Sequence, residues 1–420
     1  MTPHLQSLAD FIAASPSSYH AVAEVARQLT DAGYTELLEV DDWSSVGGRH
    51  FVIRDGAIVA WNQPVGVAAT APLRIVGSHT DSPGFKLKPK ATTGTLGWLQ
   101  AGVEVYGGPL FNSWLDRELE FAGRLAFRDG TTALVRTGAL VRFPQLAVHL
   151  DRAVNSEGLK LDPQRHLNPI IGLGDVERAD LVGHLAGLAD QTAADVAGYD
   201  ISVADTQPAA VFGLDDAFFA SGRLDNLSSV HSSLVALLGL PDPVGHTVVL
   251  AAFDHEEVGS ESRSGASGSL LADILSRLAS AVGASESDRQ RSFAASWLLS
   301  ADAGHAVHPN YPEKHDPANR PVAGGGPLLK INANQRYATD ALGAAEWARS
   351  CEAAGVEYQE FVSNNSIPCG STIGPLSATR LGIRTIDVGL GLLSMHSARE
   401  LAGAADPSNF TAAIGAFLAG

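Results

Sequence analysis

Five short polar segments of the chain contain histidine and carboxylate side chains of the kinds that bind divalent metal ions. Each segment follows a predicted buried strand, and open α/β sheets bind their ligands outside the carboxyl ends of the strands. The side chains are therefore expected to converge at one edge of a sheet. The segments are residues 78–83, 222–226, 254–259, 300–305 and 395–397.

The histidines and acids of these segments form a ligand set for two metal ions. A catalytic zinc ion binds imidazole nitrogens and carboxylate oxygens and keeps one position open for water. Two neighbouring ions need a bridging carboxylate and further ligands for each ion. Zn²⁺ is the first expectation, and Mn²⁺ or Co²⁺ also suits nitrogen and oxygen donors. The predicted ligands are His79, Asp225, Glu257, Asp302 and His396.

Two further acids have predicted roles beside the ligands. Glu256 directly precedes a predicted ligand, so it could hold the attacking water and accept its proton as a general base. Asp81 lies two residues after His79 and could accept the second N–H of that imidazole, which would set the orientation of the ring.

Each of these motifs also has a structural interpretation. A His-x-Asp motif is usually a hydrogen-bonded pair in a loop, and a Glu-Glu pair usually faces solvent. Asp225-Asn226 before a helix is typical of an N-cap, and His396 alone could be a surface histidine. The joint placement of the motifs after strands favours a metal site.

The composition limits the possible partners. The chain has 420 residues, 45% of them hydrophobic, which is typical of a globular protein with a large core. A net charge of −17 argues against nucleic acid and anionic membranes as partners. No apolar run approaches the ~18 residues of a membrane span, and no secretory signal precedes the first helix. With only Cys351 and Cys369, a disulfide framework is excluded and a cytoplasmic location is expected.

The pattern of elements predicts an α/β fold. Two amphipathic helices are expected at residues 3–14 and 18–33, and a hairpin turning at Asp55-Gly56 is expected at 51–61. From residue 222 onward strands and helices alternate, which predicts a mainly parallel sheet flanked by helices.

The region between residues 92 and 220 has a different pattern. It is rich in strand-like alternation, with one predicted helix near 178–190. We therefore predict a discontinuous catalytic α/β domain, residues 1–91 and 221–420, interrupted by a β-rich inserted domain, residues 92–220.

Seven segments, in chain order, resemble the signature blocks of the aspartyl aminopeptidases, which belong to the superfamily of two-zinc exopeptidases. The resemblance implies a two-metal aminopeptidase that removes unblocked Asp or Glu from short peptides. It also implies that the inserted domain pairs subunits and that the dimers form a dodecamer. The segments are SHTDSPGFKLKPK, SGRLDN, FDHEEVGS, SADAGHAVHPNYPEKH, GPLLKINANQRYAT, PCGSTIGP and MHSARE.

The same resemblance implies a role for each ligand. His79 and Asp302 would complete one metal position, and Glu257 and His396 would complete the other. Asp225 would bridge the two ions, and the bond after it is often cis in this superfamily.

The resemblance implies substrate contacts less directly. Lys330 would face an acidic side chain, although a strand-edge lysine is the alternative. His149 would reach the substrate carbonyl across a subunit contact, or else belong to a core or interface. Ser371 and Thr372 would donate to the substrate backbone, or else cap a helix.

Other functions remain open at this stage. A two-metal aminopeptidase of different preference and an N-acyl amidohydrolase would use the same ligands. A non-catalytic scaffold or cargo protein on this fold is an alternative of another class, although the intact ligand set with Glu256 counts against it.

Overall fold

A nine-stranded sheet forms the centre of the larger part of the molecule. The structure is a computed structural model that describes residues 1–43, 47–242 and 245–420. The strand order is β1-β2-β3-β13-β4-β14-β18-β16-β17, with parallel pairing along β13, β4, β14 and β18 and antiparallel pairing at β2/β3, β3/β13 and β18/β16. The strands are β1 (Thr35–Glu36), β2 (Gly48–Arg54), β3 (Ala57–Gln63), β4 (Leu73–His79), β13 (Thr247–Phe253), β14 (Trp297–Ala301), β16 (Leu328–Ile331), β17 (Gln359–Val362) and β18 (Arg384–Gly389).

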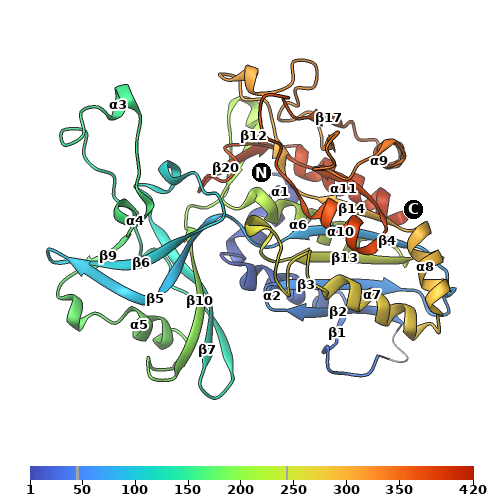
Figure 1. Cartoon of the computed structure of the whole chain (residues 1–420), viewed down its shortest axis with the longest axis horizontal. Helices are drawn as coiled ribbons and strands as arrows, with labels where there is room; N and C mark the ends of the chain where they lie inside the picture. Colours follow the sequence, from blue (N-terminus) through green and yellow to red (C-terminus); the bar gives the residue numbers. More distant parts are fainter. Residues whose placement is uncertain (44–46, 243–244) are drawn as a thin grey trace.

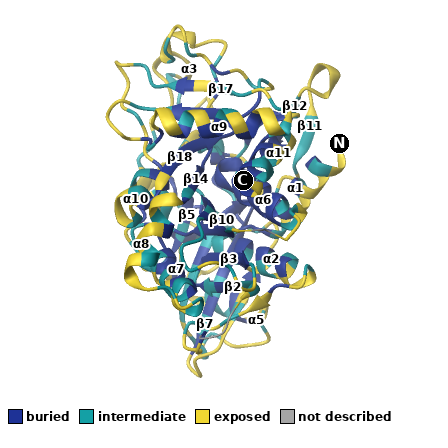
Figure 2. Ribbon diagram, turned by 90° about the vertical axis from the view of Figure 1, so that its right-hand side faces the viewer, coloured by how far each residue is buried: buried dark blue, intermediate teal, exposed yellow. Residues whose placement is uncertain are grey.

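Helices cover both faces of this sheet, which explains why its central strands carry apolar side chains on both faces. Side chains alternate along a strand: Val248 and Leu250 of β13 pack on one face, and Val249 and Ala251 pack on the other. The buried strands lie between exposed helical surfaces in Figure 2. One face is covered by α1 (Pro3–Ala14), α2 (Ser18–Asp31), α6 (Leu224–Gly239), α9 (Ala341–Ala354) and α11 (Asp406–Ala419), and the other by α7 (Leu270–Ala281), α8 (Glu286–Ala295) and α10 (Ile373–Leu381).

A second, antiparallel sheet of six strands stands beside the first (Figure 1). It has its own hydrophobic core, which includes Phe85, Phe121 and Phe143. The short helices α3 (Val154–Glu157), α4 (Pro163–His166) and α5 (Leu181–Gly187) belong to this part of the chain. Its strands, in sheet order, are β8 (Thr132–Arg136), β7 (Leu119–Phe127), β10 (Val196–Asp205), β5 (Gly84–Thr95), β6 (Trp98–Tyr106) and β9 (Ile170–Leu173).

A third sheet of five short strands joins the chain after the second sheet to the C-terminal region. The predicted insertion at residues 92–220 overlaps the second sheet, which begins at Gly84, and also contains β11 and β12 of the third sheet, of which β12 pairs with β20. The division of the chain into domains at these boundaries stays a prediction. The strands are β11 (Ala210–Phe212), β12 (Phe218–Ser221), β20 (Glu400–Gly403), β19 (Gly391–Leu393) and β15 (Gly304–His305).

Local sequence signals place several elements correctly. The predicted N-terminal helices are present as α1 and α2, and each begins after an N-cap hydroxyl, Thr2 or Ser17. The hairpin β2–β3 turns at Asp55-Gly56 as predicted. Helix α10 begins at Ile373, because the Thr372 side chain accepts the Gly374 N–H and is the N-cap.

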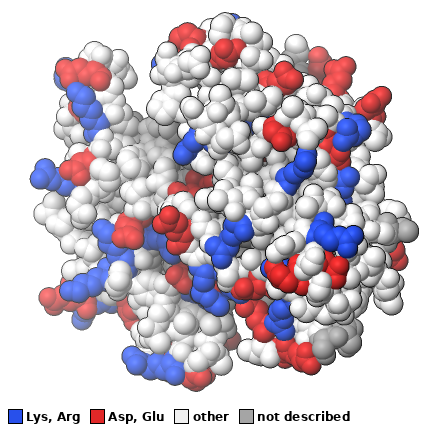
Figure 3. Space-filling view, turned by 45° about the vertical axis from the view of Figure 1, so that its right-hand side comes forward, with Lys and Arg blue, Asp and Glu red and all other residues white. Residues whose placement is uncertain are grey.

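Within the described residues, no helix is both long enough and apolar enough to cross a membrane. Lys and Arg side chains are interspersed with Asp and Glu on the face shown in Figure 3, so the acidic excess is not gathered into one patch on that face.

The turn of the β2–β3 hairpin predicts a stability effect. A Cβ at Gly56 would lie 2.1 Å from Asp254 Oδ2 and 2.7 Å from Ser18 Oγ, so Gly56→Ala forces buried atoms apart. Overpacking of this kind costs about 1–3 kcal/mol. We expect the free energy of unfolding, measured with a denaturant, to fall by this amount.

Gly239→Ala is the matched control, because Gly239 is helical and a Cβ there meets nothing within 4 Å. Alanine should raise stability there by about 0.4–1 kcal/mol, because it reduces the conformational entropy of the unfolded chain. A Gly56→Ala variant as stable as the control would contradict the packing described here.

Candidate active site

The ends of neighbouring parallel strands bring the predicted metal ligands together. His79 is the last residue of β4, Glu257 follows β13, and Asp302 follows β14. Asp225 lies in the first turn of α6, and His396 lies in the loop between β19 and β20. Their ligand atoms form overlapping groups in which all atoms lie within 4.8 Å of one another.

Asp225 lies between the two histidines. His79 Nε2 is 3.3 Å from Asp225 Oδ1, and His396 Nε2 is 3.6 Å from Asp225 Oδ2. On one side His79 Nε2 is also 3.3 Å from Asp302 Oδ1. On the other side His396 Nε2 is 3.4 Å from Glu257 Oε2. Each oxygen of the Asp225 carboxylate therefore faces a different half of the site.

The donor atoms fit a pair of divalent cations. Asp225 Oδ1 and Glu257 Oε1 are buried and have no hydrogen-bond partner among the described residues. Buried carboxylate oxygens without donors are costly unless a cation compensates them. Two imidazoles and several carboxylates are the ligands that Zn²⁺ accepts, so the residues present suit zinc.

The backbone at the ligands has unusual conformations. The Asp225-Asn226 peptide bond is cis, as the resemblance implied, and His396 has a φ of 65°. Asn226 donates from Nδ2 to the Ala301 carbonyl at 2.9 Å, which ties the start of α6 to the end of β14.

Asp81 is a centre of hydrogen bonds behind His79. His79 Nδ1 hydrogen-bonds to the Asp81 main-chain carbonyl at 3.1 Å and lies 3.3 Å from Asp81 Oδ1, which accepts the Glu256 N–H at 3.1 Å. Asp81 Oδ2 accepts the Glu257 N–H at 3.1 Å and the Tyr106 hydroxyl at 2.8 Å. Asp81 thus orients an imidazole ligand through its carbonyl and carboxylate oxygens, and its carboxylate also holds the segment that carries Glu256 and Glu257.

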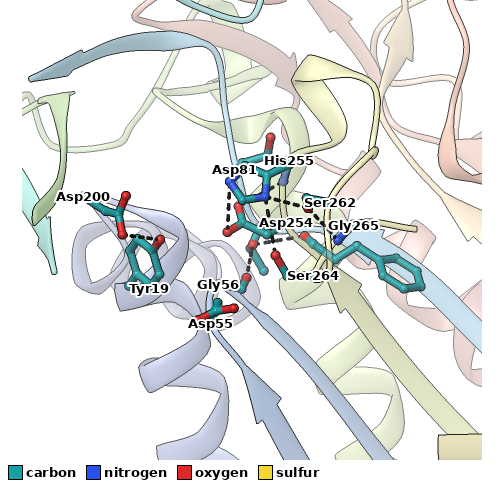
Figure 4. Close-up of polar contacts among 12 residues, drawn as sticks. Tyr19, Asp55, Gly56, Asp81, Asp200, Asp254, His255, Ser262, Ser264 and Gly265 are labelled. Atoms are coloured by element: carbon teal, nitrogen blue, oxygen red, sulfur yellow. Dashed lines mark hydrogen bonds and ion pairs between the residues drawn. The ribbon is translucent and has the colours of Figure 1, made fainter. Parts of the chain in front are cut away.

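A further group of polar contacts lies close to Asp81 (Figure 4). His255 donates its backbone N–H to Asp254 Oδ1 at 3.0 Å, and His255 Nδ1 lies 2.9 Å from Ser262 Oγ. Tyr19 of α2 donates to Asp200 of β10 at 3.0 Å, which links the two large sheets beside the site.

Sequence reasoning missed two supporting residues, Tyr106 and Glu400. Tyr106 ends β6 of the second sheet, and a single tyrosine at a strand end carries no signal of its contact with Asp81. Glu400 accepts the Asp225 N–H at 2.9 Å and the His396 N–H at 2.8 Å. It lies within the MHSARE segment, so its position near His396 was visible, but its link to Asp225 was not.

Glu256 lies in the wall of a cavity of about 410 Å³ beside the ligands. Burial raises the pKa of Glu256 to about 8, and the nearby Asp302, Asp225 and Asp81 carboxylates act in the same direction, while His79 opposes them. Burial and the same kind of charge repulsion raise the pKa of Glu257 well above its ordinary value. Cations at the ligands would favour the ionised carboxylates.

The chain matches, over residues 11–418, the family described as Aminopeptidase I zinc metalloprotease (M18). It belongs to the M18 family of zinc aminopeptidases. The predictions of family, enzyme class and fold are thereby confirmed.

Individual relatives agree with this assignment. The chain is 51% identical over 422 residues to a probable M18 family aminopeptidase 2 of Streptomyces avermitilis, with 99% of this chain and 98% of the relative covered. A chain in the cryo-EM structure of the Ape4 and Nbr1 complex has a TM-score of 0.94 and 33% identity, covering 99% and 85% of the two chains. The S. cerevisiae mApe1 dodecamer has a TM-score of 0.86 and 28% identity, covering 98% and 95%.

Lys330 of this M18 aminopeptidase lies in the cavity wall, although its side chain is buried. Its Nζ donates to the Ala303 carbonyl at 2.7 Å and lies 3.5 Å from Asp302 Oδ2. The Nζ also lies 5.3 Å from the centre of the Tyr337 ring. These contacts therefore fix the Lys330 ammonium group inside the site, and Lys330 is not an exposed lysine at the edge of a strand.

The other three predicted substrate residues, Ser371, Thr372 and His149, lie in different environments. Ser371 is exposed and lines the cavity. Thr372 also lines it, but its hydroxyl donates to Asp387 Oδ1 at 2.6 Å and caps α10, so that proton is not free for a substrate. His149 is exposed in a loop and is not part of this cavity wall.

The charges of the site predict that the stability of the metal-free enzyme and that of the metal-bound enzyme change with pH in opposite directions. The raised pKa of Glu256 means that the metal-free fold keeps a proton that the unfolded chain loses, so stability falls as pH rises from about 4.5 to about 8. The raised pKa values of His79 and His396 act in the same direction. Bound zinc needs neutral imidazoles, so it should reverse the slope.

Thermal unfolding between pH 5 and 8, with and without chelator, measures both slopes. Glu256→Gln should make the slope of the metal-free enzyme shallower, because the amide does not titrate while His79 and His396 still do. A metal-free enzyme that becomes more stable with rising pH would contradict this electrostatic description.

Proposed function

We propose that this M18 aminopeptidase removes unblocked acidic residues from the N-termini of short peptides, with two divalent ions and Glu256 as the general base. The observation that supports it is the position of Asp225 between the two halves of the ligand set, with Glu256 beside them in a cavity. His79, Asp225 and Asp302 would hold one ion, and Asp225, Glu257 and His396 would hold the other.

The chain's own residues would carry the proton transfers. Bound divalent ions supply Lewis acidity to the scissile carbonyl and lower the pKa of water. Glu256 would take a proton from the attacking water and later give it to the leaving amine. Asp81 would keep His79 oriented, and its bonds to the N–H groups of Glu256 and Glu257 would hold both side chains in place.

The preference for an acidic side chain would depend on Lys330. Among the described residues that line the cavity, it is the one lysine or arginine. An acidic side chain entering the cavity would find this cation and the exposed Ser371 hydroxyl. An aminopeptidase of another preference is the alternative, since the same ligands serve any unblocked N-terminus.

We also propose assembly into a dodecamer, as in the similar S. cerevisiae mApe1 structure. His149 lies in an exposed loop whose neighbours Leu146, Val148 and Leu150 are also exposed. Apolar side chains gathered on a surface loop are typical of a protein contact. In such an assembly His149 would reach the site of a neighbouring subunit. Free Cys351 and Cys369 agree with a cytoplasmic enzyme.

Glu256→Gln tests the general base. The amide cannot accept a proton, so kcat should fall by about 10²–10⁴-fold. Metal content, measured by mass spectrometry, should stay at the wild-type value because Glu256 is not a proposed ligand. Unchanged turnover would remove Glu256 from the mechanism.

Lys330→Met tests the specificity. The wild type should hydrolyse Asp- and Glu-linked chromogenic amides faster than Leu- and Ala-linked ones. In the variant, the ratio of kcat/KM for the Asp-linked amide to kcat/KM for the Ala-linked amide should fall about 10–100-fold. The reason is that an ionic hydrogen bond contributes about 1.5–3 kcal/mol. Taking the ratio cancels any general damage from removing the Asp302 contact. A wild type that prefers Leu, or an unchanged ratio, would reject this role.

A further inference from the structure

One buried side chain, Glu400, joins two of the proposed metal ligands through their backbones. It is the first residue of β20 and is 2% exposed. Its Oε2 accepts the Asp225 N–H at 2.9 Å, and its Oε1 accepts the His396 N–H at 2.8 Å. Because each oxygen serves a different segment, the carboxylate sets the separation of the two ligands.

The His396 backbone depends on this kind of support. Its φ of 65° lies in the left-handed region, which residues other than glycine rarely adopt without stabilising contacts. The ring is held as well, because His396 Nδ1 lies 3.0 Å from the Gly108 carbonyl, so that Nε2 faces Glu257 and Asp225. Glu400 and the Gly108 carbonyl therefore hold the backbone and the ring of one ligand.

Asp81 is the supporting residue of His79 in the other half of the site. Asp81 contacts His79 and receives the Tyr106 hydroxyl, and neither of these residues hydrogen-bonds to Glu400 within the described part of the chain. Asp81 also accepts the Glu257 N–H, so it supports both halves, whereas Glu400 accepts only the N–H groups of Asp225 and His396 and has no bond to His79 or Asp302 within the described residues. Damage to Glu400 should therefore affect the two metal positions unequally.

We infer that Glu400 is the positioning residue for the ion held by Asp225, Glu257 and His396, and that without it this ion is lost before the one at His79 and Asp302. The inference rests on the proposed two-metal function. Removing an outer residue that orients metal ligands typically weakens metal binding by about 10–100-fold.

Glu400→Gln is the direct test. The amide has nearly the same size but offers one oxygen and one NH₂ group, so one of the two backbone N–H groups would face a donor instead of an acceptor. Full-length protein is dialysed against a series of buffered free Zn²⁺ concentrations, and zinc per subunit is measured by mass spectrometry. We expect a concentration range in which the wild type holds two ions and the variant holds one.

Asp406→Asn is the matched control. Asp406 is a buried carboxylate whose Oδ2 and Oδ1 accept the N–H groups of Gly324 and Gly326 at 2.7 and 3.0 Å. The same chemical change there removes the same kind of bond without touching a proposed ligand. We expect it to lower the thermal midpoint of metal-free protein about as much as Glu400→Gln does, and to leave two ions bound.

Double variants identify which ion is lost. Glu400→Gln combined with His396→Ala should still hold one ion, because both changes affect the same position. Glu400→Gln combined with Asp302→Asn should hold none under the same conditions, because the changes affect different positions. The reverse pattern would overturn the assignment of Glu400 to the His396 half.

The remaining outcomes separate the inference from the proposed function. A wild type that never binds more than one ion would reject the two-metal proposal and the inference with it. A wild type with two ions and a Glu400→Gln variant with the same two affinities would reject only the inference. If Glu400→Gln does not fold, Glu400→Asp decides, because its shorter carboxylate cannot reach both N–H groups and should show the same loss.

Discussion

The concentration of negative charge at one end of the central sheet is the constraint on which the site depends. Carboxylates of Asp225, Glu257 and Asp302 approach two imidazoles within a buried space, and two of their oxygens have no donor among the described residues. Mutual repulsion and burial would make such a group costly in a protein without cations. The raised pKa values of Glu256 and Glu257 result from the same burial and repulsion.

The fold answers this constraint by supporting the ligands from several directions. The parallel strands β4, β13 and β14 end side by side, so that the residues after them meet without long connections. The second sheet contributes the Tyr106 hydroxyl, which reaches Asp81, and the loop after β6 contributes the Gly108 carbonyl, which reaches His396. The site of this M18 aminopeptidase is therefore built jointly by two sheets, although its proposed ligands all come from outside the second sheet.

The residues proposed to carry the chemistry were readable in the sequence, because their types are uncommon after apolar strands and their segments resemble those of a known family. His79, Asp225, Glu257, Asp302 and His396 do converge, and Glu256 lies beside them. For Thr372 the structure shows the capping alternative: its hydroxyl accepts the Gly374 N–H and donates to Asp387. From the sequence, a hydroxyl before a helix can either cap the helix or contact a substrate. Only the residues around it in the folded structure decide between these two roles.

By itself, the sequence determined which side chains can bind metal and which local elements carry them, because strand periodicity, Asp-Gly turns and capping hydroxyls act over a few residues. Only the tertiary structure decided that Asp225 faces both histidines, that Lys330 is buried against Asp302, and that Glu400 and Tyr106 support the two halves. These contacts join residues far apart in the chain, and their distances follow from how the sheets pack. No local pattern encodes such a distance.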